Sequence, residues 1–194
     1  SVYPAASTLQ VFYFDGIHTP SQVGSNVSIS VGAASVAWSP TSNFIAVVHQ
    51  NSSPLKIFYF DGINTPSQVG SDVNVGSSER VVWSYDGNFL AITSWNDGTL
   101  KIFYFDGINT PSQVGGNADS GFQSRPVAWS PDGKYLITAN MYTDRLRLFS
   151  FDGSNTPTKV GSDIYADHIY SLSWSPDGRF VYVVSVTGYL EVYT

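Results

Sequence analysis

The sixteen residues LKIFYFDGINTPSQVG occupy positions 55–70 and recur without a change at positions 100–115. A close copy begins at Leu9, and a looser one, LRLFSFDGSNTPTKVG, begins at Leu146. The leucine that opens each copy recurs after 46, 45 and 46 residues, and Leu190 follows 44 residues later. A period near 45 residues is typical of proteins built from repeated supersecondary units. The chain is therefore expected to be a row of similar units.

The elements of each unit are predicted to be β-strands. A second phrase alternates with the first and reads VAWSPTSNF at Val36, VVWSYDGNF at Val81, VAWSPDGKY at Val127 and LSWSPDGRF at Leu172. Every segment is short, rich in β-branched and aromatic residues, and bounded by Pro, Gly, Asn or Ser, which indicates strands joined by turns. The unit that starts at Val81 is expected to hold four strands, A to D, at 81–84, 89–94, 100–105 and near 112–115.

The strand sequences also predict how the units pack. Strand C, with the sequence LKIFYF, is apolar on both faces, so each four-stranded sheet is expected to lie between two others like it. The tight A–B turn carries Ser-Pro-Asp-Gly or a variant, and the longer C–D hairpin ends with a proline that favours an edge position for strand D. Four-stranded antiparallel sheets arranged radially make a β-propeller, which is the all-β fold we predict. The four tryptophans of strand A are assigned to packing between sheets: Trp38, Trp83, Trp129 and Trp174.

The repeat divides residues 1–194, as one domain, into a partial blade at 1–25, blades at 26–70, 71–115 and 116–161, and an incomplete last blade at 162–194. Counting strands gives B-C-D, three complete blades and a final A-B-C. A closed ring of five blades uses every strand and is favoured. Closure of the ring between two or more chains, and a longer array of which this chain is a part, remain open alternatives.

The repeated phrases resemble the WD-repeat propeller family. The resemblance rests on the pattern VAWSPDG at Val127, followed by a short apolar strand, and on the turn Asn96–Thr99 followed by LKIF. The chain departs from the family at the end of strand C, where Phe103-Tyr104 stands in place of Trp-Asp, and it lacks the Gly-His before strand A. The resemblance implies a rigid, non-catalytic platform for protein interaction or scaffolding.

The composition argues against several classes of function. The net charge is −6, which disfavours nucleic acid, and the longest apolar stretch, 180–184, is too short to span a membrane. Cysteine is absent, and no catalytic motif, metal site or cofactor site is predicted. The Asp-Gly hairpins offer one Asp and one Asn each, fewer oxygens than calcium requires. The chain is therefore not expected to be an enzyme.

One end of the predicted blades varies between repeats and the other does not. The A–B and C–D turns are nearly constant, whereas the B–C turns and the D–A connections differ from one unit to the next. Aromatic and arginine side chains on loops of a rigid scaffold favour a binding face, although loops also drift after duplication. The candidate face comprises His49, Arg80, Trp95, Phe122, Arg125, Met141, Tyr142, Tyr165, His168 and Tyr170. A protein partner is favoured, a carbohydrate (a lectin-like propeller) is the alternative, and self-association that completes the ring is plausible.

Overall fold

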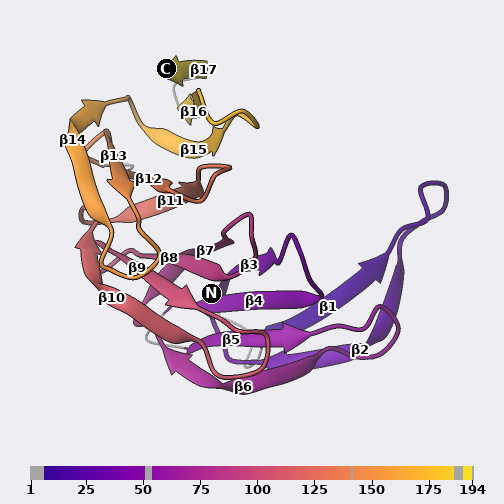
Figure 1. The fold of residues 1–194 in the computed structure, drawn as a ribbon. Helices are drawn as coiled ribbons and strands as arrows, with labels where there is room; N and C mark the ends of the chain where they lie inside the picture. Colours follow the sequence, from indigo (N-terminus) through magenta and orange to yellow (C-terminus); the bar gives the residue numbers. More distant parts are fainter. Residues whose placement is uncertain (1–6, 51–53, 141, 186–189, 194) are drawn as a thin grey trace.

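The structure, a computed structural model, describes residues 7–50, 54–140, 142–185 and 190–193. Within these residues the chain forms β-strands and no helix, hence none long and apolar enough to cross a membrane. The strands form five antiparallel sheets, each made from consecutive segments of the chain. Figure 1 shows the sheets following one another around an open arc, with β1 and β2 near one end and β15 to β17 at the other. The predicted all-β fold of four-stranded blades is confirmed.

Three sheets have four strands each. The first full sheet comprises β3 (Ala33–Trp38), β4 (Phe44–His49), β5 (Pro54–Tyr59) and β6 (Ser67–Asn74). The second comprises β7 (Ser78–Trp83), β8 (Phe89–Ser94), β9 (Thr99–Tyr104) and β10 (Ser112–Asp119). The third comprises β11 (Ser124–Trp129), β12 (Tyr135–Asn140), β13 (Arg145–Ser150) and β14 (Thr158–Tyr165). The N-terminal sheet holds β1 (Ser7–Tyr13) and β2 (Ser21–Ile29), and the C-terminal sheet holds β15 (Ile169–Trp174), β16 (Val181–Ser185) and β17 (Leu190–Tyr193).

Strand D of each full sheet is longer than the sequence predicts. β10 pairs with β9 from Ser112 to Val114 and again from Ala118 to Asp119, with a bulge between the two stretches. The bulge begins at Gly115, whose φ of 63° suits glycine. β2, β6 and β14 carry the same irregularity. Segments that the sequence assigns to D–A connections are therefore partly strand.

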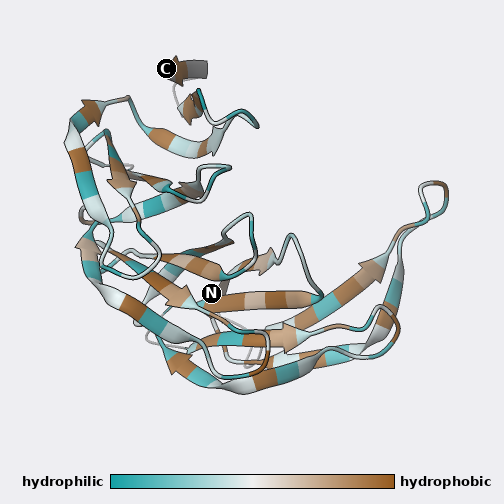
Figure 2. Cartoon of the chain, in the orientation of Figure 1, coloured by the Kyte–Doolittle hydropathy of each residue, from teal (hydrophilic) through white to brown (hydrophobic). Residues whose placement is uncertain are grey.

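The central strands of each full sheet are buried on both faces, as predicted. In β9, Leu100 and Ile102 pack in an apolar cluster shared with the third full sheet. Phe103 and Phe105 pack in a second cluster, shared with the first full sheet. Figure 2 shows the buried strand β4 brown along most of its length, whereas the outer strand β6 alternates between brown and teal. Burying a side chain of this size stabilises the fold by roughly 1.5–3 kcal/mol, so these clusters are the main attraction between sheets.

The strand A tryptophans link sheets where a preceding strand A exists. Trp83 is buried and donates its ring N–H to the carbonyl oxygen of Ala37 in the preceding sheet, at 3.1 Å. Trp129 is also buried, and Trp174 is half-buried. Trp38 is 49 % exposed, so its assignment to an inter-sheet core is wrong. The reason is that β1 and β2, the described strands of the N-terminal sheet, leave the first strand of their neighbour uncovered.

A threonine in the C–D hairpin of each full sheet fastens that sheet to the preceding one. The Thr110 hydroxyl oxygen accepts a hydrogen bond from the Ser71 amide, in the bulge of β6, at 2.8 Å. The same bond recurs at the two adjacent junctions, from Ser25 to Thr65 at 2.7 Å and from Gly116 to Thr156 at 2.5 Å. We call this bond the threonine clasp. The repeated phrase supplies both partners of the threonine clasp, because the threonine of one copy bonds to the bulge at the end of the preceding copy.

The closed ring of five blades is not the observed arrangement. β1 and β2 pair only with each other among the described residues, and they lie far from β15 to β17 on the arc (Figure 1). Aromatic pairs such as Phe44 with Phe105 and Phe89 with Phe151 join one sheet to the next and fill the space between them. The strand B predicted before β1 falls on residues 1–6, outside the described residues.

Candidate binding face

Turns and connections gather at the two ends of every sheet. The A–B turns and the C–D hairpins lie at one end, called here the turn end. The turns between β4 and β5, β8 and β9, and β12 and β13 lie at the opposite end with the D–A connections, and this is called the loop end. The two ends correspond to the constant and the variable parts of the repeat.

At the turn end, the same aspartate cap holds each C–D hairpin. Asp106 accepts the amides of Ile108 and Asn109 at 2.9 and 2.7 Å, and the side-chain amide of Asn109 at 2.7 Å. These bonds, the Asn109 amide foremost, lower the pKa of Asp106 from 3.8 to about 2. Asp61 is capped in the same way, and in the first hairpin His18 replaces the asparagine beside Asp15. The repeated aspartates therefore stabilise the turns by hydrogen bonding, as the sequence predicts.

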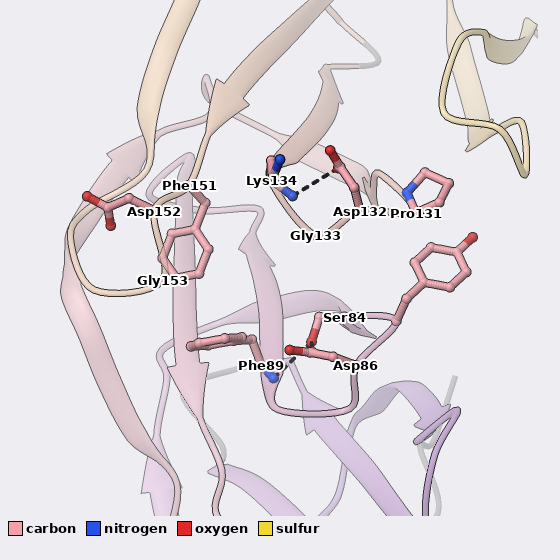
Figure 3. Close-up of a pocket in the computed structure, with 11 residues that line it drawn as sticks. Ser84, Asp86, Phe89, Pro131, Asp132, Gly133, Lys134, Phe151, Asp152 and Gly153 are labelled. Carbon is pink, nitrogen blue, oxygen red and sulfur yellow. Dashed lines mark hydrogen bonds between the residues drawn. The ribbon is translucent and has the colours of Figure 1, made fainter.

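A pocket of about 380 Å³ opens at the turn end between the second and third full sheets (Figure 3). The rings of Phe89 and Phe151 line it, with centroids 5.1 Å apart. The carboxylates of Asp86 and Asp132 each accept a hydrogen bond from the serine two residues earlier, at 2.5 and 2.6 Å. That bond lowers the pKa of Asp132, so the carboxylate stays ionised. Lys134 is the one cation among the lining residues.

At the loop end, three of the predicted face residues form one stack. Trp95 follows β8 and Tyr142 follows β12, and their ring centroids lie 5.5 Å apart at an interplanar angle of 77°. The guanidinium carbon of Arg125 lies 4.1 Å from the centroid of a Trp95 ring. Such a cation–π contact contributes about 0.5–1 kcal/mol at an exposed site. The Trp95 carbonyl oxygen also accepts the Gln123 amide at 3.0 Å, which fixes the backbone under the stack.

An acid and an amide extend the stack across neighbouring sheets. The Glu79 carboxylate lies 3.8 Å from Arg125 Nε, and it accepts a hydrogen bond from the Gln50 side chain at 3.0 Å. Gln50 follows β4, Glu79 lies in β7 and Arg125 lies in β11, so the row of contacts spans all three full sheets. Glu79 and Gln50 are not among the residues predicted for the face. The available signal was that Glu79 is one of only two glutamates in the chain and lies in a variable connection.

Four further predicted residues are exposed near the loop end. Phe122, Tyr165 and Tyr170 are 63 %, 60 % and 63 % exposed. Arg80 is exposed at the start of β7. The guanidinium carbon of Arg145 lies 5.7 Å from the centroid of the Tyr165 ring, which adds a second arginine–aromatic pair. The loop end therefore carries most of the predicted candidates on its surface.

Two predicted residues do not contribute to the described face. His49 is fully buried, so its assignment to an exposed face is corrected. Its Nδ1 lies 2.8 Å from the Pro54 carbonyl oxygen, and the side chain is buried at the end of β4, which lies between β3 and β5 in the sheet. Met141 lies outside the described residues.

A polar cluster links the third full sheet to the C-terminal sheet at the loop end. The His168 amide donates to Asp144 at 2.8 Å, and His168 Nδ1 lies 2.6 Å from an Asp167 carboxylate oxygen. The bond to Asp167, with the charge of Asp144, raises the pKa of His168. Within the described part of the chain these three residues are the one group whose potential metal-ligand atoms all lie within 4.8 Å of one another. Their mutual hydrogen bonds tie the β12–β13 turn to the connection before β15.

Two family models match the sequence. The model described as "WD domain, G-beta repeat" matches residues 159–193, and the model described as "Eukaryotic translation initiation factor eIF2A" matches residues 6–157. Together with the four-stranded sheets, these matches define a WD-repeat-like β-propeller. The chain belongs to the eIF2A family, since that model covers more than half of its length. No curated protein matches the sequence significantly.

Solved structures share the fold at low identity. A "putative 6-phosphogluconolactonase" from Bacteroides uniformis is 20 % identical with a TM-score of 0.74, over 95 % of this chain and 63 % of its own. A protein of the same description from Bacteroides fragilis is 17 % identical with a TM-score of 0.80, over 95 % and 60 %. A chain of the mitotic checkpoint complex is 20 % identical with a TM-score of 0.74, over 97 % and 59 %. The present chain thus spans about three fifths of these relatives' length.

These relatives correct one prediction and refine another. The expectation that the chain is not an enzyme is wrong as a deduction from the fold, because two propellers of the same shape are named as lactonases. The WD-repeat match supports a general role in protein interaction. The WD-repeat-like resemblance itself is confirmed.

Proposed function

We propose that the chain binds a protein partner through its loop end, with Trp95, Arg125 and Tyr142 at the centre of the contact. The observation that carries the proposal is the stack of these side chains, which the turn after β8, the turn after β12 and the start of β11 build on adjoining sheets. Tryptophan, tyrosine and arginine are the residue types that most often dominate the energy of protein interfaces. Because sheet packing and the Glu79 carboxylate already hold the stack, a partner orders few side chains on binding.

The exposure of the stack fits a partner that covers it. Tyr142 is 66 % exposed and Trp95 is half-buried, so the tryptophan is anchored from below while the tyrosine projects. Phe122 flanks them at 63 % exposure. Burying one such ring contributes about 1.5–3 kcal/mol. A central aromatic cluster with an ion pair at its side matches the usual anatomy of an interface, an apolar centre with a polar rim.

Charge and family membership narrow the kind of partner. The family's description favours a setting in translation initiation. The net charge of −6 disfavours direct contact with the phosphates of RNA. Within that setting we therefore propose a protein component, and not the nucleic acid, as the partner.

The test compares two double variants of the immobilised chain. Proteins captured from a cell extract are identified by mass spectrometry, and each one purified is titrated against the wild type. Trp95→Ala with Tyr142→Ala should weaken binding at least about tenfold, the loss of a single interface hot spot. Ile63→Ser with Ile108→Ser, which changes two 75 % exposed side chains at the turn end, should leave the affinity unchanged. Equal affinity of the wild type and the loop-end variant would refute the proposal, and specific sugar binding on a glycan array would favour the carbohydrate alternative.

Hydrolysis of a sugar lactone at the turn-end pocket is a second candidate function. The pocket gathers the ionised carboxylates of Asp86 and Asp132 with the Lys134 amine, and two relatives are named as lactonases. An ionised carboxylate can activate a water as a general base, and the ammonium can stabilise a developing oxyanion. Hydrolysis of 6-phosphogluconolactone that is lost in Asp86→Asn and Lys134→Met variants would support this function. The same rate with and without the protein would exclude it.

A further inference from the structure

The negative charge of the chain is concentrated at the turn end. Seven of the fifteen acidic residues lie there, three in the A–B turns and four in the C–D hairpins, and all seven are aspartates. Of the nine lysines and arginines, only Lys134 and Arg179 lie in these turns, whose residues the structure describes throughout. Seven negative and two positive side chains give this end a net charge of −5, out of −6 for the whole chain. Such a surface attracts cations and repels anions.

The pocket at this end is open because two A–B turns stand apart. At the junction of the first and second full sheets, the Thr41 hydroxyl donates to the Asp86 carbonyl oxygen at 3.3 Å, and a Cβ added at Gly87 would collide with that hydroxyl. At the junction of the second and third full sheets, Gly133 takes the place of Gly87, and a Cβ added there meets nothing within 4 Å. The volumes agree, with about 180 Å³ at the first junction and about 380 Å³ at the second. Both sheets at the open junction are complete and have a further sheet on their other side, so the opening belongs to the junction itself.

Aromatic and acidic side chains line the open pocket together. The rings of Phe89 and Phe151 lie edge to face, at an interplanar angle of 83°. Asp86, Asp132 and Asp152 also belong to the lining. Figure 3 shows Asp86 on one A–B turn and Asp132 on the facing one. An aromatic ring face and a carboxylate each attract a guanidinium or ammonium group, so the lining suits a cation.

Asp132 has hydrogen-bonding capacity left for a ligand. Its Oδ1 accepts the Ser130 hydroxyl at 2.6 Å and the Lys134 amide at 3.1 Å. Within the described part of the chain its Oδ2 accepts no hydrogen bond, and the residue is exposed. A donor from another molecule can therefore bind Oδ2 without breaking the bonds that hold the turn.

We propose that the open pocket binds the guanidinium of an arginine that a basic segment of a partner protein presents. The planar guanidinium can stack on a phenylalanine ring while its N–H groups donate to Asp132 and Asp86. Lysine is the poorer fit, because its ammonium has no plane to stack and is more strongly hydrated. The aspartates of the neighbouring turns attract the other cations of the segment. The pocket shares no residue with the stack of Trp95, Arg125 and Tyr142, so this site goes beyond the function proposed for the loop end.

Lys134 distinguishes this ligand from a lactone at the same pocket. Its ammonium belongs to the lining and repels a cation, so Lys134→Met should bind the arginine more tightly. The second candidate function uses the same ammonium to stabilise an oxyanion and predicts that this variant loses activity. One substitution thus has opposite effects under the two hypotheses, and a gain in affinity cannot come from a damaged fold.

The experiment titrates the chain with a fluorescently labelled peptide of alternating glycine and arginine, followed by anisotropy. Asp132→Asn should weaken binding at least about tenfold, the loss of one charge-assisted hydrogen bond. Asp177→Asn is the matched control, because Asp177 accepts the same two bonds in its own A–B turn, from Ser175 at 2.5 Å and from the Arg179 amide at 3.1 Å, and lies outside the pocket. This control removes the same charge from the turn end and should change the affinity less than about twofold.

Two comparisons complete the test. A peptide with lysine in place of arginine should bind more weakly, and the double variant Trp95→Ala with Tyr142→Ala should bind the arginine peptide as the wild type does. No binding by the wild type, equal losses in Asp132→Asn and Asp177→Asn, weaker binding by Lys134→Met, or a lysine peptide that binds as tightly would each overturn the proposal. None of these results bears on the loop end, so the two sites can fail separately.

Discussion

Replacing Gly70 with alanine should destabilise the protein far more than the same change at Gly62. Both glycines belong to the repeated phrase, and both have positive φ, +67° and +89°. An added Cβ meets nothing within 4 Å at Gly62, but lies 2.8 Å from backbone atoms of Thr110 at Gly70. Gly62→Ala therefore measures the backbone strain alone, and Gly70→Ala measures the strain plus the loss of the threonine clasp.

The magnitudes follow from these contacts. A left-handed backbone conformation costs an alanine about 1–2 kcal/mol, and this cost is common to both variants. At Gly70 the neighbouring backbone must also move, which costs about 1–3 kcal/mol. The hydrogen bond from Ser71 to Thr110, 2.8 Å long, is lost or weakened and contributes about 0.5–1.5 kcal/mol more. The free energy of unfolding should therefore differ between the two variants by about 1.5–4.5 kcal/mol.

Urea unfolding followed by tryptophan fluorescence measures this difference. A repeat protein need not unfold in one step, so the slope of the transition is compared along with its midpoint. Equal midpoints for Gly70→Ala and Gly62→Ala would refute the reasoning. They would mean that the threonine clasp does not hold neighbouring sheets together.

Three further predictions concern stability. Phe149→Ala, at a side chain only 1 % exposed, should lower the free energy of unfolding in urea by about 3–5 kcal/mol, and a loss below about 1 kcal/mol would mean that the core between the second and third full sheets is not formed. Trp83→Phe removes the hydrogen bond to Ala37 and should cost about 1 kcal/mol in the same assay, whereas no change would show that the bond is not made. Asp106 has a pKa of about 2 in the folded chain against 3.8 ordinarily, so its contribution is present above pH 3.8 and is lost as the pH falls towards 2. The melting temperature of Asp106→Asn should fall less steeply than that of the wild type across this window, and parallel curves would contradict the aspartate cap.

The sequence predicts the fold well because every repeat carries the same signals for a four-stranded sheet. The alternation of LKIFYF, the Asp-Gly turns and the period near 45 residues each indicate the same four-stranded sheet, and the structure confirms it. The length of strand D is missed, since the bulge at Gly115 depends on the next hairpin and not on local preference. The open arc is also missed, because the way successive sheets lie against one another is not stated by the pattern within one repeat.

The sequence predicts at which end of the sheets the candidate face lies, but it does not predict which side chains contact one another there. Topology brings Trp95, Arg125 and Tyr142 to one end of adjoining sheets, and variation between repeats selects that end. Their stacking, and the part played by Glu79, depend on rotamers and on the distance between sheets. His49 shows the limit of the approach, because its position beside a loop predicts exposure, while its place at the end of the central strand β4 buries it.

The most direct test of the central claim, that the loop end is the recognition face, is hydrogen–deuterium exchange of the chain with and without a purified protein partner. Binding should slow exchange in residues 94–98, 122–125 and 142–145, which surround the stack of Trp95, Arg125 and Tyr142. The turn-end hairpins at 61–66 and 106–111 should exchange at the same rate in both states. Slower exchange in those hairpins, with no change around Trp95, would contradict the account.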